Sequence, residues 1–194
     1  MSANPPILLR TEHFLLRPIT TADAQLDYEA VMATKDFLRG WEQTGWPADD
    51  FTVEENRADL LRMEKRHKTG ESWSYTVLDP SESQCLGCVY ITPTSAPVFQ
   101  KPEIIALDHN NWADYDVAVY FWIRKELMET TIEREFLDRL QKWFAETWKL
   151  RNVLFITSEV CSHHIGLLES KGYLSVFNLK YADKPGLEVA FGRI

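Results

Sequence analysis

The chain has 194 residues, of which 45% are hydrophobic and 26% charged, and these fractions exclude disordered, collagen-like and coiled-coil proteins. The 21 basic and 29 acidic residues give a formal net charge of −8, which argues against nucleic acid or an anionic membrane as the main partner. The length predicts a single domain over residues 1–194. Three cysteines make no secreted disulfide framework, and neither a signal segment nor a membrane span is evident, so we expect a cytoplasmic protein.

Hydrophobic spacing and turn residues predict helices and strands in the order β α α β β β α β α β β. The expected ranges are 13–19, 20–39, 52–68, 72–78, 85–91, 115–123, 131–148, 152–157, 162–171, 174–180 and 187–191. Thr20 with Asp23 and Thr52 with Glu55 have the spacing of capping boxes at the starts of the first two helices. Residues 93–113 show no clear periodicity and predict a long functional or mobile loop.

The centre of the chain predicts a parallel crossover. Residues 115–123 are apolar on both faces, which is typical of a central strand, and 152–157 form a second buried strand. The helix over 131–148 connects them, and a strand–helix–strand unit places its two strands parallel. The remaining strands form antiparallel hairpins, so we expect an α/β protein (α+β in the stricter sense) with a mixed sheet and helices on both faces.

Four local motifs, taken in this order, resemble the GNAT superfamily of acyl-CoA-dependent N-acetyltransferases. They are His13–Ile19 followed by Asp23, then Leu86–Ile91, Trp122–Arg124 and Leu167–Tyr173. The resemblance extends from about residue 8 to residue 192. It implies a GNAT-like, mostly antiparallel sheet in which one parallel pair of strands splays apart.

The resemblance also implies a binding site for acetyl-CoA in the gap between the splayed strands. Backbone groups of Phe121, Trp122 and Ile123 would bind the pantetheine arm as an added strand does. The pyrophosphate would lie on the start of the next helix, where free N–H groups and the helix dipole bind anions. The other positions implied in cofactor binding are Arg124, Thr130, Thr131, Ile132 and Cys161, the last of which stands where the family has an asparagine.

The sequence departs from the family at the start of this helix. Thr131 and Glu133 occupy the two positions at which the family has glycine, or glycine and alanine, and Met128 occupies the position of its arginine or glutamine. Thr130 and Glu133 have the spacing of a capping box, which would satisfy the helix terminus internally. These differences leave two hypotheses open, a transferase or a binding module that has lost the pyrophosphate site.

The candidate catalytic residues follow from what acetyl transfer requires. The reaction needs a base for the amine and a proton for the leaving thiolate. Asp116 and Glu159 are the carboxylates that we select as bases, with Asp114 beside the first, and Tyr173 is a candidate acid because Leu168 stands where some family members have tyrosine. The alternative for each carboxylate is an exposed loop acid or a helix cap.

A metal site is not expected. Cys85 and Cys88 offer zinc-ligand types together with Cys161, His163 and His164. Residues three apart on a regular strand point to opposite faces, however, so the two strand cysteines would not reach one ion.

Three tryptophans fall in predicted loops, namely Trp41, Trp46 and Trp112. Loop aromatics often line a pocket or an interface. With Asp49 and Asp50 they would form an acidic, aromatic-lined cleft for an amine. A homodimer surface and plain packing under the loops are the alternatives.

We therefore expect an N-acyltransferase that moves an acetyl or other acyl group from acetyl-CoA to an amine of a small molecule or a protein. The alternative is a catalytically degenerate GNAT-fold binding module. Neither hypothesis involves nucleic acid or a membrane.

Overall fold

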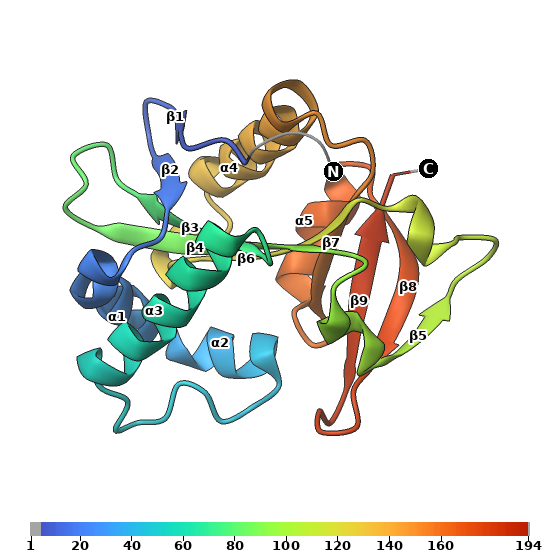
Figure 1. Cartoon of the computed structure of the whole chain (residues 1–194), viewed down its shortest axis with the longest axis horizontal. Coiled ribbons are helices and arrows are strands. Elements are labelled where there is room, and N and C mark those ends of the chain that lie inside the picture. Colours follow the sequence, from blue (N-terminus) through green and yellow to red (C-terminus); the bar gives the residue numbers. More distant parts are fainter. Residues whose placement is uncertain (1–4, 194) are drawn as a thin grey trace.

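The computed structural model describes residues 5–193. Its strands form one nine-stranded sheet in the order β1-β2-β3-β4-β6-β7-β9-β8-β5 (Figure 1). The strands are β1 (Leu9–Arg10), β2 (Leu15–Pro18), β3 (Trp73–Leu78), β4 (Cys85–Pro93), β5 (Glu103–Ala106), β6 (Val117–Ile123), β7 (Val153–Ser158), β8 (Leu174–Lys180) and β9 (Leu187–Gly192). The helices are α1 (Ala24–Ala33), α2 (Lys35–Glu42), α3 (Val53–Thr69), α4 (Thr131–Lys142) and α5 (Ser162–Ser170).

The sheet is antiparallel except for one central pair, β6 and β7, which runs parallel. This pair confirms the predicted crossover through α4. One apolar cluster joins α4 and α5 to one face of the sheet, and a second joins α1, α2 and α3 to the other. The predicted mixed, mostly antiparallel sheet with helices on both faces is therefore confirmed.

Several boundaries differ from the predicted ones. The predicted first helix is divided at Thr34 into α1 and α2, and α4 gives way at Trp143 to a wider π-helical segment that ends at Trp148. The predicted loop over 93–113 contains β5, which pairs with β8 at the edge of the sheet. An edge strand of four residues with one partner lacks the apolar alternation by which strands are recognised.

Two of the predicted capping boxes are present. The Asp23 side chain accepts the N–H of Thr20 at 2.8 Å, and the Glu55 side chain accepts the N–H of Thr52 at 2.8 Å. Thr52 in turn accepts the N–H of Glu55. Short-range polar pairs of this kind depend only on local sequence, which is why they could be predicted.

A bulge in β4 reverses one prediction about its cysteines. Cys85 faces Leu78 and Gly87 faces Val77 across the β3–β4 pair, so Leu86 is an extra residue in β4. An inserted residue shifts the alternation of side chains by one position. Cys85 and Cys88 therefore share the face that packs on α1–α3, and the expectation that they point to opposite faces was wrong.

Among residues 5–193, no helix combines the length and the apolar character that a membrane crossing requires.

Candidate functional site

The parallel strands β6 and β7 diverge along their length. They pair only from Val117 to Val119 and from Val153 to Phe155. Beyond these residues β6 continues to pair with β4, and β7 continues to pair with β9. Within the described residues, the edge of β6 from Tyr120 to Ile123 has no strand partner on the side of β7. The predicted divergence is thus present, and we call the gap the β6–β7 slot.

His164 covers the β6–β7 slot from the side of α5. Its ring stacks on Phe121 of β6 with centroids 4.8 Å apart, and its Nδ1 lies 3.3 Å from the hydroxyl of Thr157 on β7. Phe37 of α2 packs edge-on against the same ring at 5.0 Å. Burial lowers the pKa of His164 to about 3, so the ring is neutral. A neutral ring in this position adds no positive charge for an anion.

The segment that follows β6 leads into α4 and provides few free donors. Lys125 donates its N–H to the hydroxyl of Thr34, and Arg124 donates to a β4 carbonyl. The backbone N–H groups that are already bonded within the protein belong to Arg124, Lys125, Leu127, Met128, Glu129 and Thr130. A phosphate-binding loop depends on such groups being available to the ligand.

Glu133 occupies the position where the start of α4 would receive a phosphate. Its side chain is fully buried, accepts the N–H of Glu129 at 2.9 Å, and lies 2.7 Å from Nε2 of His163. The expected capping box of Thr130 and Glu133 was wrong. Glu133 accepts the N–H of Glu129 in place of that of Thr130, because Glu129 has a φ of 63° that turns its N–H toward the carboxyl group. The hydroxyl of Thr130 instead donates to the carbonyl of Leu127. An acidic side chain at a helix N-terminus disfavours a diphosphate there.

The positions expected to hold the cofactor therefore divide into two groups. Phe121, Trp122 and Ile123 lie on the unpartnered edge of β6, and this edge fits a pantetheine arm bound through backbone groups. The remainder fit a cofactor less well. Arg124 pairs with Glu126 at 2.5 Å, Thr131 is exposed at the start of α4, Ile132 packs against the core, and Cys161 is a buried thiol before α5 whose pKa burial raises to about 11.

The three expected catalytic residues lie in three different places. Asp116 sits at the paired end of β6 and β7 and accepts the N–H of Arg151 at 2.8 Å. Glu159 is exposed and accepts the N–H of Leu187 at 2.8 Å, which holds the start of β9. Tyr173 packs edge-on against Phe155 beneath α4, and burial raises its pKa to about 12. The structure does not bring these side chains together.

A cavity of about 550 Å³ opens beside the point where β6 and β7 diverge. Tyr120, the first residue of β6 beyond the paired region, forms part of its wall. The cavity is bounded by α2, β4, β6, β9, the segment before β5 and the β8–β9 turn. Its lining residues are Trp41, Glu42, Tyr90, Thr92, Val98, Phe99, Lys101, Tyr120, Tyr181, Ala182, Asp183, Lys184 and Glu188.

An acidic, aromatic-lined cavity is thus present, but most of the residues expected to line it do not. Trp41 lines the cavity, whereas Trp46 packs on Phe51 and Trp112 packs between Phe99 and Phe177. Asp49 lies outside it and pairs with Lys35 and Arg39, and Asp50 is exposed and absent from its lining. That these tryptophans form a homodimer surface stays a prediction.

Charged groups converge at one end of the cavity. Glu188 is 4% exposed, accepts the hydroxyl of Tyr120 at 2.8 Å, and pairs with Lys184 at 2.5 Å. Glu42 lies 3.8 Å from Lys184, and burial raises the pKa of this carboxyl group. Three carboxyl groups and two lysines line the cavity, so its formal charge is −1 when all are ionised. An apolar cavity with excess negative charge favours a cationic ligand.

Sequence reasoning missed Tyr120 and Glu188. Burial, followed by the charge of Glu188, raises the pKa of Tyr120 well above its usual value, so the phenol keeps its proton and acts as a donor. A signal for Glu188 exists in the sequence, because it is an acidic residue inside the otherwise apolar strand 187–191. Tyr120 has no such signal, since a tyrosine in a buried strand is ordinarily part of the core.

Neither a protein-family model nor a curated protein matches the sequence. Solved structures do match. A ribosomal-protein alanine acetyltransferase from Vibrio fischeri is 16% identical with a TM-score of 0.70 over 97% of both chains. The ribosomal-protein acetyltransferase RimL, in complex with coenzyme A, is 14% identical with a TM-score of 0.68 over 97% of this chain and 98% of its own.

An acetyltransferase of the GNAT family from Bacillus anthracis is 11% identical, with a TM-score of 0.65 over 97% of this chain and 98% of its own. Identities this low establish the fold alone. The match nevertheless runs along nearly the whole length of each chain. The chain therefore has the fold of the GNAT acetyltransferases.

Proposed function

We propose that the chain is an N-acyltransferase that transfers an acyl group from a pantetheine thioester such as acetyl-CoA to an amine bound in the cavity. The observation that carries the proposal is the position of the cavity at the point where β6 and β7 diverge. A thioester lying along the free edge of β6 would end beside Tyr120. Amine and acyl carbon would then meet without either having to cross the sheet.

The side chains around Glu188 supply the proton chemistry. An amine reaches the cavity mostly as an ammonium ion, and it must lose a proton before its nitrogen can attack. Glu188 is placed to accept that proton, with Lys184 and Tyr120 holding its two oxygens. As nitrogen bonds to the acyl carbon and the carbon–sulfur bond breaks, the Tyr120 phenol protonates the leaving thiolate and takes the proton held by Glu188 in its place. The second proton of the nitrogen is released to solvent through the open cavity, so Glu188 ends the cycle ionised.

The acceptor is proposed as a small amine with an apolar body. A cavity of this size is typical of small-molecule sites, and its aromatic walls attract cations. Lys184 already lies 5.2 Å from the centre of the Tyr181 ring. Two of the similar structures are named as ribosomal-protein acetyltransferases, so a peptide with a free α-amino group is the second acceptor class to test.

The buried carboxyl group of Glu133 favours a second candidate, a binding protein that no longer uses a donor. A thiol-release assay with acetyl-CoA and a panel of amines and N-terminal peptides distinguishes the two. Amine-dependent release supports the transferase. Failure of every amine, together with no heat on titrating millimolar acetyl-CoA, contradicts it and leaves the binding protein.

For that second candidate, the double variant Thr131→Gly, Glu133→Gly provides the complementary test. A gain in affinity for CoA would support a binding protein that has lost its phosphate site. No change in affinity would indicate that these two positions are not what prevents binding.

A further inference from the structure

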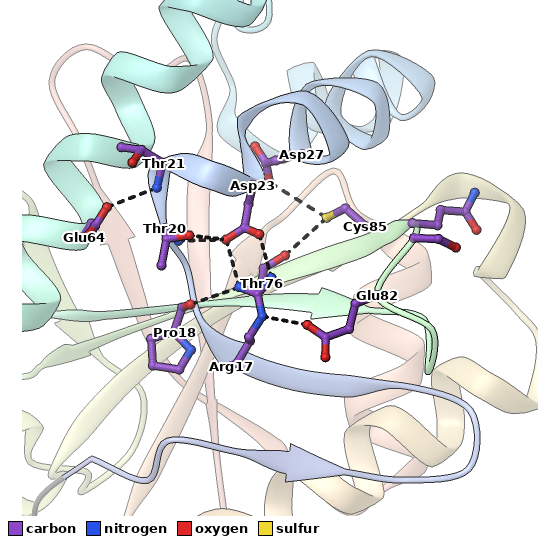
Figure 2. Close-up of polar contacts among 12 residues, drawn as sticks. Arg17, Pro18, Thr20, Thr21, Asp23, Asp27, Glu64, Thr76, Glu82 and Cys85 are labelled. Carbon is purple, nitrogen blue, oxygen red and sulfur yellow. Dashed lines mark hydrogen bonds and ion pairs between the residues drawn. The ribbon is translucent and has the colours of Figure 1, made fainter.

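Two cysteines and one aspartate meet in the core beneath α1, away from the cavity and the β6–β7 slot. The bulge at Leu86 turns Cys85 and Cys88 to the same face of β4. Asp27 of α1 points at Cys85 in Figure 2, and it also contacts Cys88. Asp27 Oδ1 lies 3.1 Å from the sulfur of Cys88 and 3.9 Å from that of Cys85. Asp27 is 3% exposed and both cysteines are fully buried.

In the part of the chain that the structure describes, Asp27 is bonded to uncharged groups and not to a basic side chain. Arg17, the nearby arginine in Figure 2, makes two hydrogen bonds to Asp23 at 2.8 and 3.0 Å and a third to Glu82. Asn56 is the polar partner of Asp27 other than the thiols, and it donates to Oδ2 at 2.9 Å. Within residues 5–193 no lysine, arginine or histidine pairs with this carboxyl group. Burying a carboxyl group without a cation is costly unless something else compensates it.

The three side chains have the separations of a metal centre. Zinc binds sulfur at about 2.3 Å and carboxylate oxygen at about 2.0–2.2 Å, so neighbouring tetrahedral ligands stand about 3.5 Å apart for a sulfur–oxygen pair. The observed separations of 3.1 and 3.9 Å lie on either side of that value, and all three ligand atoms lie within 4.8 Å of one another. Asn56 holds Oδ2, which leaves Oδ1 directed at the sulfurs, as outer partners of metal ligands do.

We propose that Asp27, Cys85 and Cys88 bind one zinc ion. Two thiol protons are released on binding, and the ion compensates the buried carboxylate. Two further oxygens lie close to the sulfur of Cys85. They are the hydroxyl oxygen of Thr76, at 3.6 Å, and the carbonyl oxygen of Gly87, at 3.4 Å. Since every ligand is buried, the ion is structural, joining α1 to the bulge of β4.

Metal content tests this proposal on the full chain, independently of any transferase activity. The protein is unfolded with chelator under reducing conditions, refolded with one equivalent of Zn²⁺ or Co²⁺, desalted and analysed by mass spectrometry for metal. We expect about one ion per chain, with thiolate–Co²⁺ absorption in the near ultraviolet. Cys161→Ser is the control, because Cys161 is also buried but is not one of the three proposed ligands. This variant is expected to bind as much metal as the wild type does.

Two variants remove ligands. Cys88→Ser and Asp27→Asn are each expected to lower Zn²⁺ affinity at least 100-fold, and Asp27→Asn keeps the size of the side chain, so it carries the test if Cys88→Ser fails to fold. Less than one tenth of an equivalent of either ion in the wild type would overturn the proposal. So would unchanged binding in both variants, or a Cys85–Cys88 disulfide found by mass in the protein as isolated.

Discussion

The cavity beside Tyr120 and the start of α4 lie at opposite ends of the β6–β7 slot, and they differ in what they offer a ligand. The cavity is open, aromatic and has excess negative charge, with Glu188 at its inner end. At the start of α4 an acidic side chain is already present, because Glu133 accepts the N–H of Glu129 and contacts His163. Both ends therefore carry acidic side chains, which favour a cation and disfavour an anion.

The two ends of the slot depend on the sequence in different ways. The divergence of β6 and β7 depends on the pairing of a whole sheet, and the cavity is built from several elements. Anion binding at α4 depends on a few positions with small side chains and free N–H groups. Substitutions at those few positions can therefore change anion binding without changing the sheet or the cavity.

Glu188→Gln is the change with the largest expected effect, and it tests the cavity end. An amide cannot accept the proton of the ammonium group, so we expect kcat/KM for the amine to fall about 10²–10³-fold. Thiol release at pH 7.5 measures it. Glu42→Gln is the control, since Glu42 lies 3.8 Å from Lys184 and does not contact Tyr120. Equal losses in both variants would contradict the role given to Glu188.

Trp41→Leu sharpens the same comparison by removing an aromatic wall. Trp41 packs against Tyr90 and Tyr120 in the cavity. Loss of its contact with a cation predicts a KM for the amine about tenfold higher with kcat little changed. Trp46→Leu, in the following loop, removes a tryptophan that contacts Phe51 and lies outside the cavity lining. A similar rise in KM for Trp46→Leu would indicate a general effect on the loop.

His164→Phe tests the closed side of the slot and has the smallest expected effect. The pKa of His164 is lowered from 6.5 to about 3, so the unfolded chain binds a proton that the folded chain does not as pH falls below 7. Stability that is present above pH 6.5 is therefore lost with falling pH, by about 0.7 kcal/mol between pH 7 and pH 6. Denaturant titrations at the two pH values should show this loss in the wild type and a smaller one in the variant. Equal losses of stability in the wild type and the variant would show that a group other than His164 titrates.

The parts of the fold that could be predicted are those set by local sequence. The alternation of polar and apolar residues in 72–78 predicted β3, and the polar pair of Thr52 and Glu55 predicted the start of α3. β5 was missed because its four residues have one strand partner and little burial. The bulge at Leu86 was missed because it is defined by the facing strand, so the expected faces of the two cysteines were wrong.

The candidate site was harder to predict than the fold. Residues 121–123 could be expected to line the slot because the order of the four motifs resembles the family and places these residues at the end of the central strand. Glu188, Tyr120 and Trp41 meet only when β9, β6 and α2 are assembled, and no spacing in the sequence joins them. Asp116 and Glu159 looked available as bases, but each is bonded to the backbone of a neighbouring segment. Asp116, Glu159 and Tyr173 remain predictions that kinetics must test.

The most direct test of the account compares acetyl-CoA with S-acetylpantetheine, which lacks the diphosphate and the nucleotide, by calorimetric titration. If the start of α4 contributes nothing to diphosphate binding, the two should bind the wild type with dissociation constants within about threefold of each other, and Glu133→Ala should tighten acetyl-CoA alone. A wild-type affinity for acetyl-CoA about 100-fold above that for S-acetylpantetheine, unchanged in Glu133→Ala, would contradict the account. It would mean that a diphosphate is bound by residues other than those described.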